Sequence, residues 1–176
     1  MGDKIMDNYF RIGVVLLLCL PAYGAGAQDC RATIAPSAED NRYTDHSDGT
    51  ITDGETRLMW KKCSQGFTGD DCMTGSEDSL NWQQALQAAE DEDFASYSDW
   101  RLPNINELTS LIEVSCIYPA INETLFPNLI EPSVYWSSSP TVYNSDLVSA
   151  IVFHEGGEEN LFKDSAHSVR LVRGGE

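Results

Sequence analysis

The cysteines of this chain are its first candidates for chemistry, because a cysteine can act as a nucleophile, a zinc ligand or a disulfide partner. Their number and spacing indicate which of these roles applies. Five cysteines are present, and Cys19 lies in an apolar N-terminal run that precedes Cys30, Cys63, Cys72 and Cys116. Zinc ligands usually come in pairs two to four residues apart, whereas eight residues separate Cys63 from Cys72. The four later cysteines therefore predict two disulfides, for which three pairings are possible.

The other residue types that could form an active site are scattered. The three histidines lie in separate segments, and the serine run 137–139 lacks the Gly-x-Ser-x-Gly pattern of a nucleophile elbow. Asp45, Asp48 and Asp53 lie close together, but they do not alternate as calcium ligands do, and no bidentate glutamate closes the loop. The sequence therefore predicts no catalytic residue, no metal site and no cofactor, and it assigns these aspartates to turns.

The N-terminal segment indicates export. The apolar run 12–20 is shorter than the roughly twenty residues that span a bilayer, and Ala25 and Ala27 are the small residues that signal peptidase requires. We therefore expect a signal peptide over residues 1–27 and a mature chain from Gln28 without a transmembrane segment. Such a protein would be periplasmic, at the cell surface or extracellular. An uncleaved N-terminal membrane anchor is the alternative.

The charge of the chain excludes polyanionic partners. The net charge is −17, and neither Lys nor Arg occurs between Cys63 and Trp100 or between Leu102 and Phe162. Such a surface repels nucleic acid and anionic membranes. A solvated acidic surface that keeps an exported protein soluble accounts for the charge.

Turn and periodicity signals divide the mature chain into elements that would position these residues. Residues 28–41 form an irregular lead-in, and the domain covers 42–176. Asp-Gly pairs at 48–49 and 53–54 predict hairpin turns. Apolar residues at three- and four-residue spacing predict a helix capped by Ser79. Three runs of β-branched and aromatic residues predict strands over 133–139, 147–154 and 167–174.

The stretch SDWRLPNINEL, residues 98–108, leads from an extended segment into a second helix. Pro103 disfavours helix at the residue before it. Asn104 and Glu107 have the spacing of a capping box, in which each side chain accepts a hydrogen bond from the other residue's backbone. We therefore expect the second helix to begin directly after Asn104.

No nucleophile or base stands beside Arg101 in the sequence, so we expect this stretch to be structural. Trp100 should fill the core, and Arg101 should pair with Asp99 or Glu107. The residues to which we assign structural roles, here and in the last strands, are Asp99, Trp100, Arg101, Pro103, Asn104, Glu107, Trp136, Arg170 and Arg173.

Seven short motifs occur in order across the domain: DGTITD, TRLMWKKC, WQQAL, YSDWRLPNINEL, FPN, YWSSSP and VRLVRGG. Together they resemble the C-terminal domain family of the Legionella collagen-like adhesin (Lcl). The WRLP…EL element is also similar to one in formylglycine-generating enzymes. The resemblance implies a disulfide-bonded α+β domain with a C-type-lectin-like fold, in which two helices flank a mixed, mostly antiparallel sheet.

The resemblance also implies a disulfide pairing. In such a fold the termini usually lie close together, which suits a bridge from Cys30 to Cys116 and leaves Cys63 to pair with Cys72. The adhesin that names the family binds sulfated glycosaminoglycans, a task that needs a basic surface. This chain departs from that requirement, because its net charge is strongly negative.

We therefore expect an exported binding or adhesion module without catalysis, which recognises a glycan or an envelope protein and could form an oligomer. The weak candidates for ligand contacts are Glu155, Glu158 and Glu159, in an acid-rich loop over 155–160. One alternative is an enzyme resembling the formylglycine-generating group, which would need reduced cysteines. Another is a structural subunit of a surface assembly, in which Trp136 packs against a neighbouring subunit.

Overall fold

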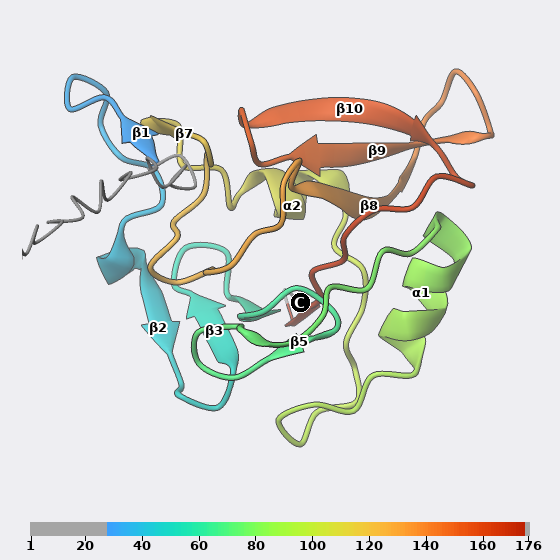
Figure 1. Ribbon diagram of the computed structural model, residues 1–176, viewed down its shortest axis with the longest axis horizontal. Helices are drawn as coiled ribbons and strands as arrows, with labels where there is room; N and C mark the ends of the chain where they lie inside the picture. The colour runs from blue at the N-terminus through green and yellow to red at the C-terminus, as the bar shows by residue number, and fades with distance from the viewer. Residues whose placement is uncertain (1–27, 175–176) are drawn as a thin grey trace, which may run out of the picture.

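Two short α-helices lie in the middle of the chain between two runs of short strands, and the strands described here pair in antiparallel fashion (Figure 1). This computed structural model describes residues 28–174, so the expected signal peptide, 1–27, lies outside it. No helix in the described part is long and apolar enough to cross a membrane. The elements are β1 (Asp29–Cys30), the 3-10 helix η1 (Asp40–Arg42), β2 (Tyr43–Asp45), β3 (Thr50–Asp53), β4 (Leu58–Lys61), β5 (Phe67–Thr68), β6 (Thr74–Gly75), α1 (Trp82–Glu90), α2 (Ile105–Thr109), β7 (Cys116–Ile117), β8 (Val134–Pro140), β9 (Leu147–Val152), β10 (Gly157–Phe162) and β11 (Val172–Gly174).

The strands are divided among four small sheets, where the resemblance implied one mixed sheet. Their orders are β1-β7, β10-β9-β8, β11-β4-β3-β2 and β5-β6. The α+β class is therefore confirmed, and the single sheet is wrong. The long-range contacts that divide the strands are not visible in local sequence patterns.

The predicted hairpins form β2, β3 and β4, and their aspartates hold the turns. The carboxylate of Asp48 accepts hydrogen bonds from the backbone N–H and the hydroxyl of Thr50, at 3.0 and 2.6 Å. The carboxylate of Asp53 accepts from the backbone N–H of Glu55 at 2.9 Å and from the hydroxyl of Thr56 at 2.7 Å. Each aspartate is thus occupied by its own turn, as aspartate side chains commonly are.

The structure places strand β10 where we expected an acid-rich loop over 155–160. All six residues of β10 pair with β9, from Gly157 opposite Val152 to Phe162 opposite Leu147. Glu and Asn are poor strand formers, but an edge strand keeps its charged side chains in water. Pairing with β9 therefore outweighs local propensity.

The two helices begin with the same kind of cap. At α2 the side chain of Asn104 accepts from the N–H of Glu107 at 3.0 Å, and Glu107 accepts from the N–H of Asn104 at 2.8 Å, as predicted. At α1 the cap is Asn81, which exchanges the equivalent bonds with Gln84. The predicted cap, Ser79, is wrong, because the next residue is held extended in a bridge to His167.

The helices cover opposite faces of the sheet formed by β8, β9 and β10. Successive residues of a strand point to opposite faces, and accordingly Tyr135 belongs to one core cluster and Trp136 to the other. Helix α2 contributes Leu108 to the first cluster, and α1 contributes Ala85 and Ala89 to the second. The domain is therefore stabilised by two apolar clusters, one on each side of this sheet.

Candidate functional site

The two disulfides anchor loops that are otherwise short of regular structure. Cys30 is bonded to Cys116, and Cys63 to Cys72, which is the pairing that the resemblance implied. The structural reason for the Cys30–Cys116 bridge differs from the expected closeness of the chain termini. Cys30 and Cys116 lie opposite each other in the β1-β7 sheet, whereas the C-terminal strand β11 belongs to another sheet. The bridge therefore joins the lead-in to β7, and proximity of the chain ends plays no part.

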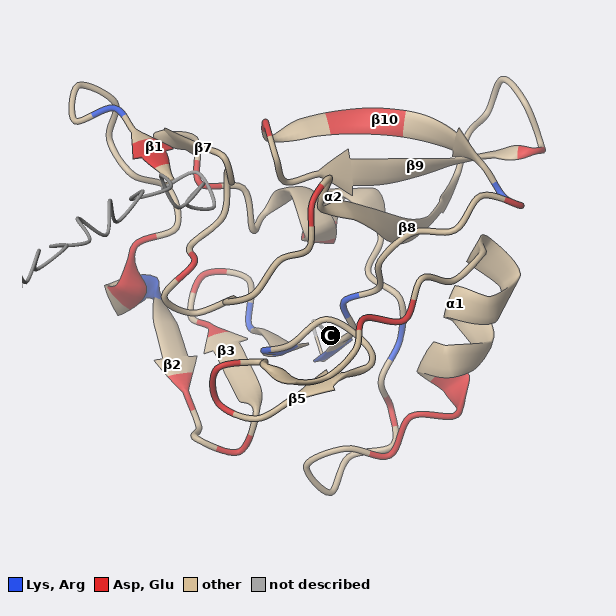
Figure 2. Cartoon of the chain, viewed as in Figure 1, with Lys and Arg blue, Asp and Glu red and all other residues tan. Residues whose placement is uncertain are grey.

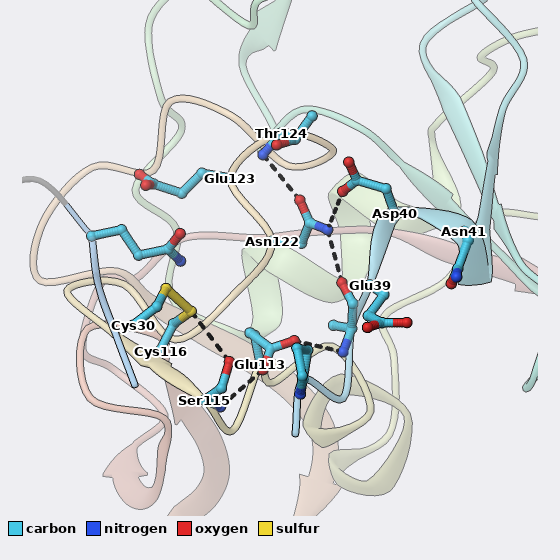
Figure 3. Close-up of a pocket in the computed structure, with 13 residues that line it drawn as sticks. Cys30, Glu39, Asp40, Asn41, Glu113, Ser115, Cys116, Asn122, Glu123 and Thr124 are labelled. Carbon is cyan, nitrogen blue, oxygen red and sulfur yellow. Dashed lines mark hydrogen bonds between the residues drawn. A yellow bond between two sulfur atoms is a disulfide. The ribbon is translucent and has the colours of Figure 1, made fainter. Parts of the chain in front are cut away.

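Beside the Cys30–Cys116 bridge lies a pocket of about 530 Å³, which we call the acidic pocket (Figure 3). One wall comes from the lead-in and η1, and the other from β7 and the segments directly before and after it. Among residues 28–174, no Lys, Arg or His lines it. Its lining residues are Gln28, Cys30, Pro36, Ala38, Glu39, Asp40, Asn41, Glu113, Ser115, Cys116, Asn122, Glu123 and Thr124.

Glu113 is the buried carboxylate of this pocket and ties its two walls together. It accepts hydrogen bonds from the backbone N–H groups of Ser37 and Ala38, at 3.0 and 2.7 Å. It also accepts from the hydroxyl of Ser115 at 2.6 Å. Burial opposes ionisation, but these hydrogen bonds outweigh it and lower the pKa of Glu113. The group is therefore a fixed negative charge that orders the lead-in.

Asn122 is a second residue that joins the two walls of the pocket (Figure 3). Its side-chain amide donates to the backbone carbonyl of Ala38 at 2.8 Å and to the carboxylate of Asp40 at 2.7 Å. Its side-chain oxygen accepts from the backbone N–H of Thr124 at 3.0 Å. The carboxylate of Asp40 is therefore held in place before any ligand arrives.

Glu39 and Glu123 supply the remaining carboxylates. Neither side chain forms a hydrogen bond or an ion pair with any residue between 28 and 174. Burial and the nearby carboxylate of Glu131 raise the pKa of Glu123. Figure 2 shows acidic positions at the start of η1, next to the basic Arg42 that ends this helix. Glu39, Asp40 and Glu123 are exposed, so the pocket presents negative charge at the surface, where it can attract a cation.

The stretch 98–108 has the structural contacts that its sequence indicated. Trp100 is only 4% exposed, and Arg101 forms a two-point ion pair with Glu107, at 2.7 and 2.8 Å. Asp99 pairs with Arg173, 74 residues further along the chain, at 2.7 Å. Since these three side chains are engaged within the fold, we do not place the candidate site at this stretch.

Arg170 and Trp136 are fully buried. Arg170 donates to the backbone carbonyls of Lys61 and Lys62, and its guanidinium lies 5.0 Å from the ring centre of Phe126. Burial lowers the pKa of Arg170. The indole N–H of Trp136 donates to the backbone carbonyl of Leu80 at 2.8 Å. Trp136 therefore has no surface to offer a second subunit, and that expectation is wrong.

The three glutamates proposed as ligand contacts lie away from the acidic pocket. Glu155 is in the turn between β9 and β10, and Glu158 and Glu159 are exposed on the edge strand β10. None of them lines the pocket. The sequence reasoning passed over Glu39, Asp40, Glu113 and Glu123, although their closeness to Cys30 and Cys116 in the sequence was a signal, since that bridge brings both segments together.

The antiparallel sheets, the two short helices and the two disulfides define a disulfide-bonded α+β domain. Residues 49–173 match the family model of the Lcl C-terminal domain, and the chain belongs to this family. A comparison with curated proteins finds no match. The matched segment includes one wall of the acidic pocket, with Glu113 and Glu123, whereas the lead-in that builds the other wall precedes it.

Proposed function

We propose that this protein is an exported, non-catalytic binding module whose acidic pocket holds a positively charged side chain of an envelope protein. One observation carries the proposal: the pocket is lined by Glu39, Asp40, Glu113 and Glu123 and by no basic residue of the described part of the chain. Membership of the Lcl C-terminal domain family supports a role at the cell surface or in the periplasm.

A protein partner is favoured over a glycan at this pocket. Sugar sites commonly combine a few polar groups with an aromatic or apolar lining, and no aromatic side chain from residues 28–174 lines this pocket. Carboxylates with a preorganised orientation instead suit the ammonium of lysine or the guanidinium of arginine. A cationic amino sugar is the competing ligand, and it serves as a comparison in the binding test below.

The absence of catalysis in this proposal is supported by the state of the cysteines. All four cysteines between residues 28 and 174 are bonded in disulfides. An enzyme resembling the formylglycine-generating group would need reduced cysteines, so a thiol titration of the denatured, unreduced protein tests that alternative. Free thiols in stoichiometric amount would contradict the binding-module proposal.

We further propose that the fold is C-type-lectin-like. The two helices on opposite faces of the β8-β9-β10 sheet support this assignment. A crystal structure superposed on known members of that fold would test it, and a different strand order would overturn it.

Neutralising the pocket should weaken binding of a basic peptide. We expect the double variant Asp40→Asn/Glu123→Gln to bind a synthetic (Arg-Gly)4 peptide about fivefold to tenfold more weakly, since each partly exposed charge pair contributes up to about 1 kcal/mol. Isothermal titration calorimetry at two salt concentrations measures the change, with glucosamine as the amino-sugar comparison.

The matched control for this experiment is Glu158→Gln/Glu159→Gln, which removes the same charge from the exposed edge strand β10. We expect it to leave affinity within about twofold. Equal weakening in both double variants would mean that general charge attraction explains the binding. Binding of glucosamine alone would replace the protein partner with a glycan.

Affinity for the same peptide should fall as the pH is lowered from about 7 to about 5. Because the pKa of Glu123 is raised, this carboxylate becomes protonated at a higher pH than an ordinary glutamate, and its neutral form no longer attracts a cation. Binding should therefore be accompanied by proton release, which calorimetry in buffers of different ionisation enthalpy detects. The Glu123→Gln variant should show a smaller pH dependence, and an unchanged dependence would exclude Glu123 as its source.

A further inference from the structure

At the start of α1, Trp82 borders a second hollow, of about 410 Å³, which we call the Trp82 hollow. It lies between α1 and the segment that follows β10, on the side of the molecule away from β1 and β7 (Figure 1). Its lining residues are Asn81, Trp82, Gln83, Leu86, Lys163 and Asp164. Unlike the acidic pocket, it combines an aromatic ring with both signs of charge.

The indole of Trp82 is held in a fixed orientation. Its ring N–H donates to the backbone carbonyl of Ser137 at 2.9 Å, and its backbone N–H donates to the carbonyl of Lys163 at 3.0 Å. These bonds connect α1 to β8 and to the segment after β10. A preorganised ring loses little conformational entropy when a ligand stacks against it.

Lys163 and Asp164 place a donor and an acceptor beside this ring. The ammonium of Lys163 lies over one face of the Trp82 ring, 4.6 Å from the ring centre. Within residues 28–174 neither Lys163 nor Asp164 forms an ion pair, although five other Lys and Arg side chains do: Arg42, Lys61, Lys62, Arg101 and Arg173. Both residues follow β10 directly, as the blue and red positions after this strand show in Figure 2.

This combination fits the chemistry of a neutral sugar. The C–H face of a pyranose can pack on the indole ring in place of the Lys163 ammonium that lies over it. The sugar hydroxyls can then donate to the carboxylate of Asp164 and accept from the displaced ammonium. Because Lys163 and Asp164 carry opposite charges, the hollow has little net charge, which favours a neutral ligand over an anionic one. We propose that the Trp82 hollow binds a neutral pyranose unit of a glycan, independently of the acidic pocket.

Tryptophan fluorescence offers a readout specific to this site. The chain has four tryptophans, and Trp60, Trp100 and Trp136 are buried in the core. Acrylamide, a quencher in solution, should therefore act mainly on Trp82. We expect maltotriose, cellotriose or the N-acetylglucosamine trimer to protect Trp82 from quenching in a saturable manner, with a Kd in the millimolar range or below.

Two substitutions separate the proposed contacts from stability. Asp164→Asn removes the acceptor charge and Lys163→Met keeps the side-chain stem without the donor, and we expect each to weaken sugar binding at least about threefold. Glu158→Gln, on the exposed edge strand β10, is the control and should bind like the parent protein. Unchanged thermal unfolding of the variants shows that folding is retained.

Three results would overturn the proposal. The first is that none of the three sugars protects Trp82 from quenching at concentrations up to about 10 mM. The second is that the parent protein and both variants bind sugar with equal affinity. The third is that only a heparin oligosaccharide protects Trp82. The (Arg-Gly)4 titration on the same protein preparation distinguishes failure here from failure of the acidic-pocket proposal, because the two ligands occupy different sites.

Discussion

Trp100→Ala is expected to lower the free energy of unfolding by about 3–5 kcal/mol, which is typical of truncating a buried tryptophan. Trp100 packs in the cluster between α1 and the β8-β9-β10 sheet, with ring contacts to Phe94 and Tyr97 at 6.2 and 6.5 Å between centroids. Its indole N–H donates to the backbone carbonyl of Phe94 at 3.1 Å. The substitution would therefore leave a cavity and remove one of the two hydrogen bonds to the Phe94 carbonyl, which also accepts from the backbone N–H of Tyr97 at 3.0 Å.

Urea unfolding followed by circular dichroism measures this loss. Tyr143→Ala is the matched aromatic control, because Tyr143 is 96% exposed, and we expect it to change stability by no more than about 0.5 kcal/mol. A Trp100→Ala protein with normal stability would show that Trp100 is not part of the core and would reopen the stretch 98–108 as a ligand contact.

Removal of the Cys30–Cys116 disulfide should cost more stability than removal of Cys63–Cys72. The first bridge joins residues 86 positions apart and the second joins residues 9 positions apart. Closing a longer loop restricts the unfolded chain more, and the chain-entropy model gives about 4.5 and about 2.5 kcal/mol respectively. The Cys30–Cys116 bridge also fixes the lead-in, so its loss should weaken (Arg-Gly)4 binding at the acidic pocket.

The comparison uses Cys30→Ala/Cys116→Ala and Cys63→Ala/Cys72→Ala, each unfolded in urea without reductant. Mass spectrometry of a non-reduced digest first establishes which bridge remains in each variant. A larger loss in the Cys63→Ala/Cys72→Ala protein would contradict the loop-entropy argument. A peptide that joins Cys30 to Cys63 in the parent protein would contradict the pairing itself.

The features that local sequence predicted correctly are those that a few neighbouring residues decide. The carboxylates of Asp48 and Asp53 bind their own turns, and Asn104 and Glu107 cap α2 through bonds that span three residues. The α1 cap shows the limit of this reasoning, because Ser79 and Asn81 both have suitable side chains and a bridge to His167 selects the second.

Charge and exposure were harder to predict because they depend on partners far away in the chain. Arg101 had two candidate partners, and the structure gives it Glu107 while Arg173 pairs with Asp99. The strand β10 was not predicted from its acidic residues, since only pairing with β9 stabilises it.

By itself, the sequence determined the family, the α+β class and the local turns and caps, because ordered motifs and short-range hydrogen bonds are written in adjacent residues. Only the tertiary structure decided the four sheets, the acidic pocket and the Trp82 hollow. The pocket forms where the Cys30–Cys116 bridge brings Asp40 beside Asn122, and the hollow forms where Lys163 meets Trp82. Both sites combine segments about eighty residues apart, and such closeness arises from the packing of the whole domain, which no local pattern encodes.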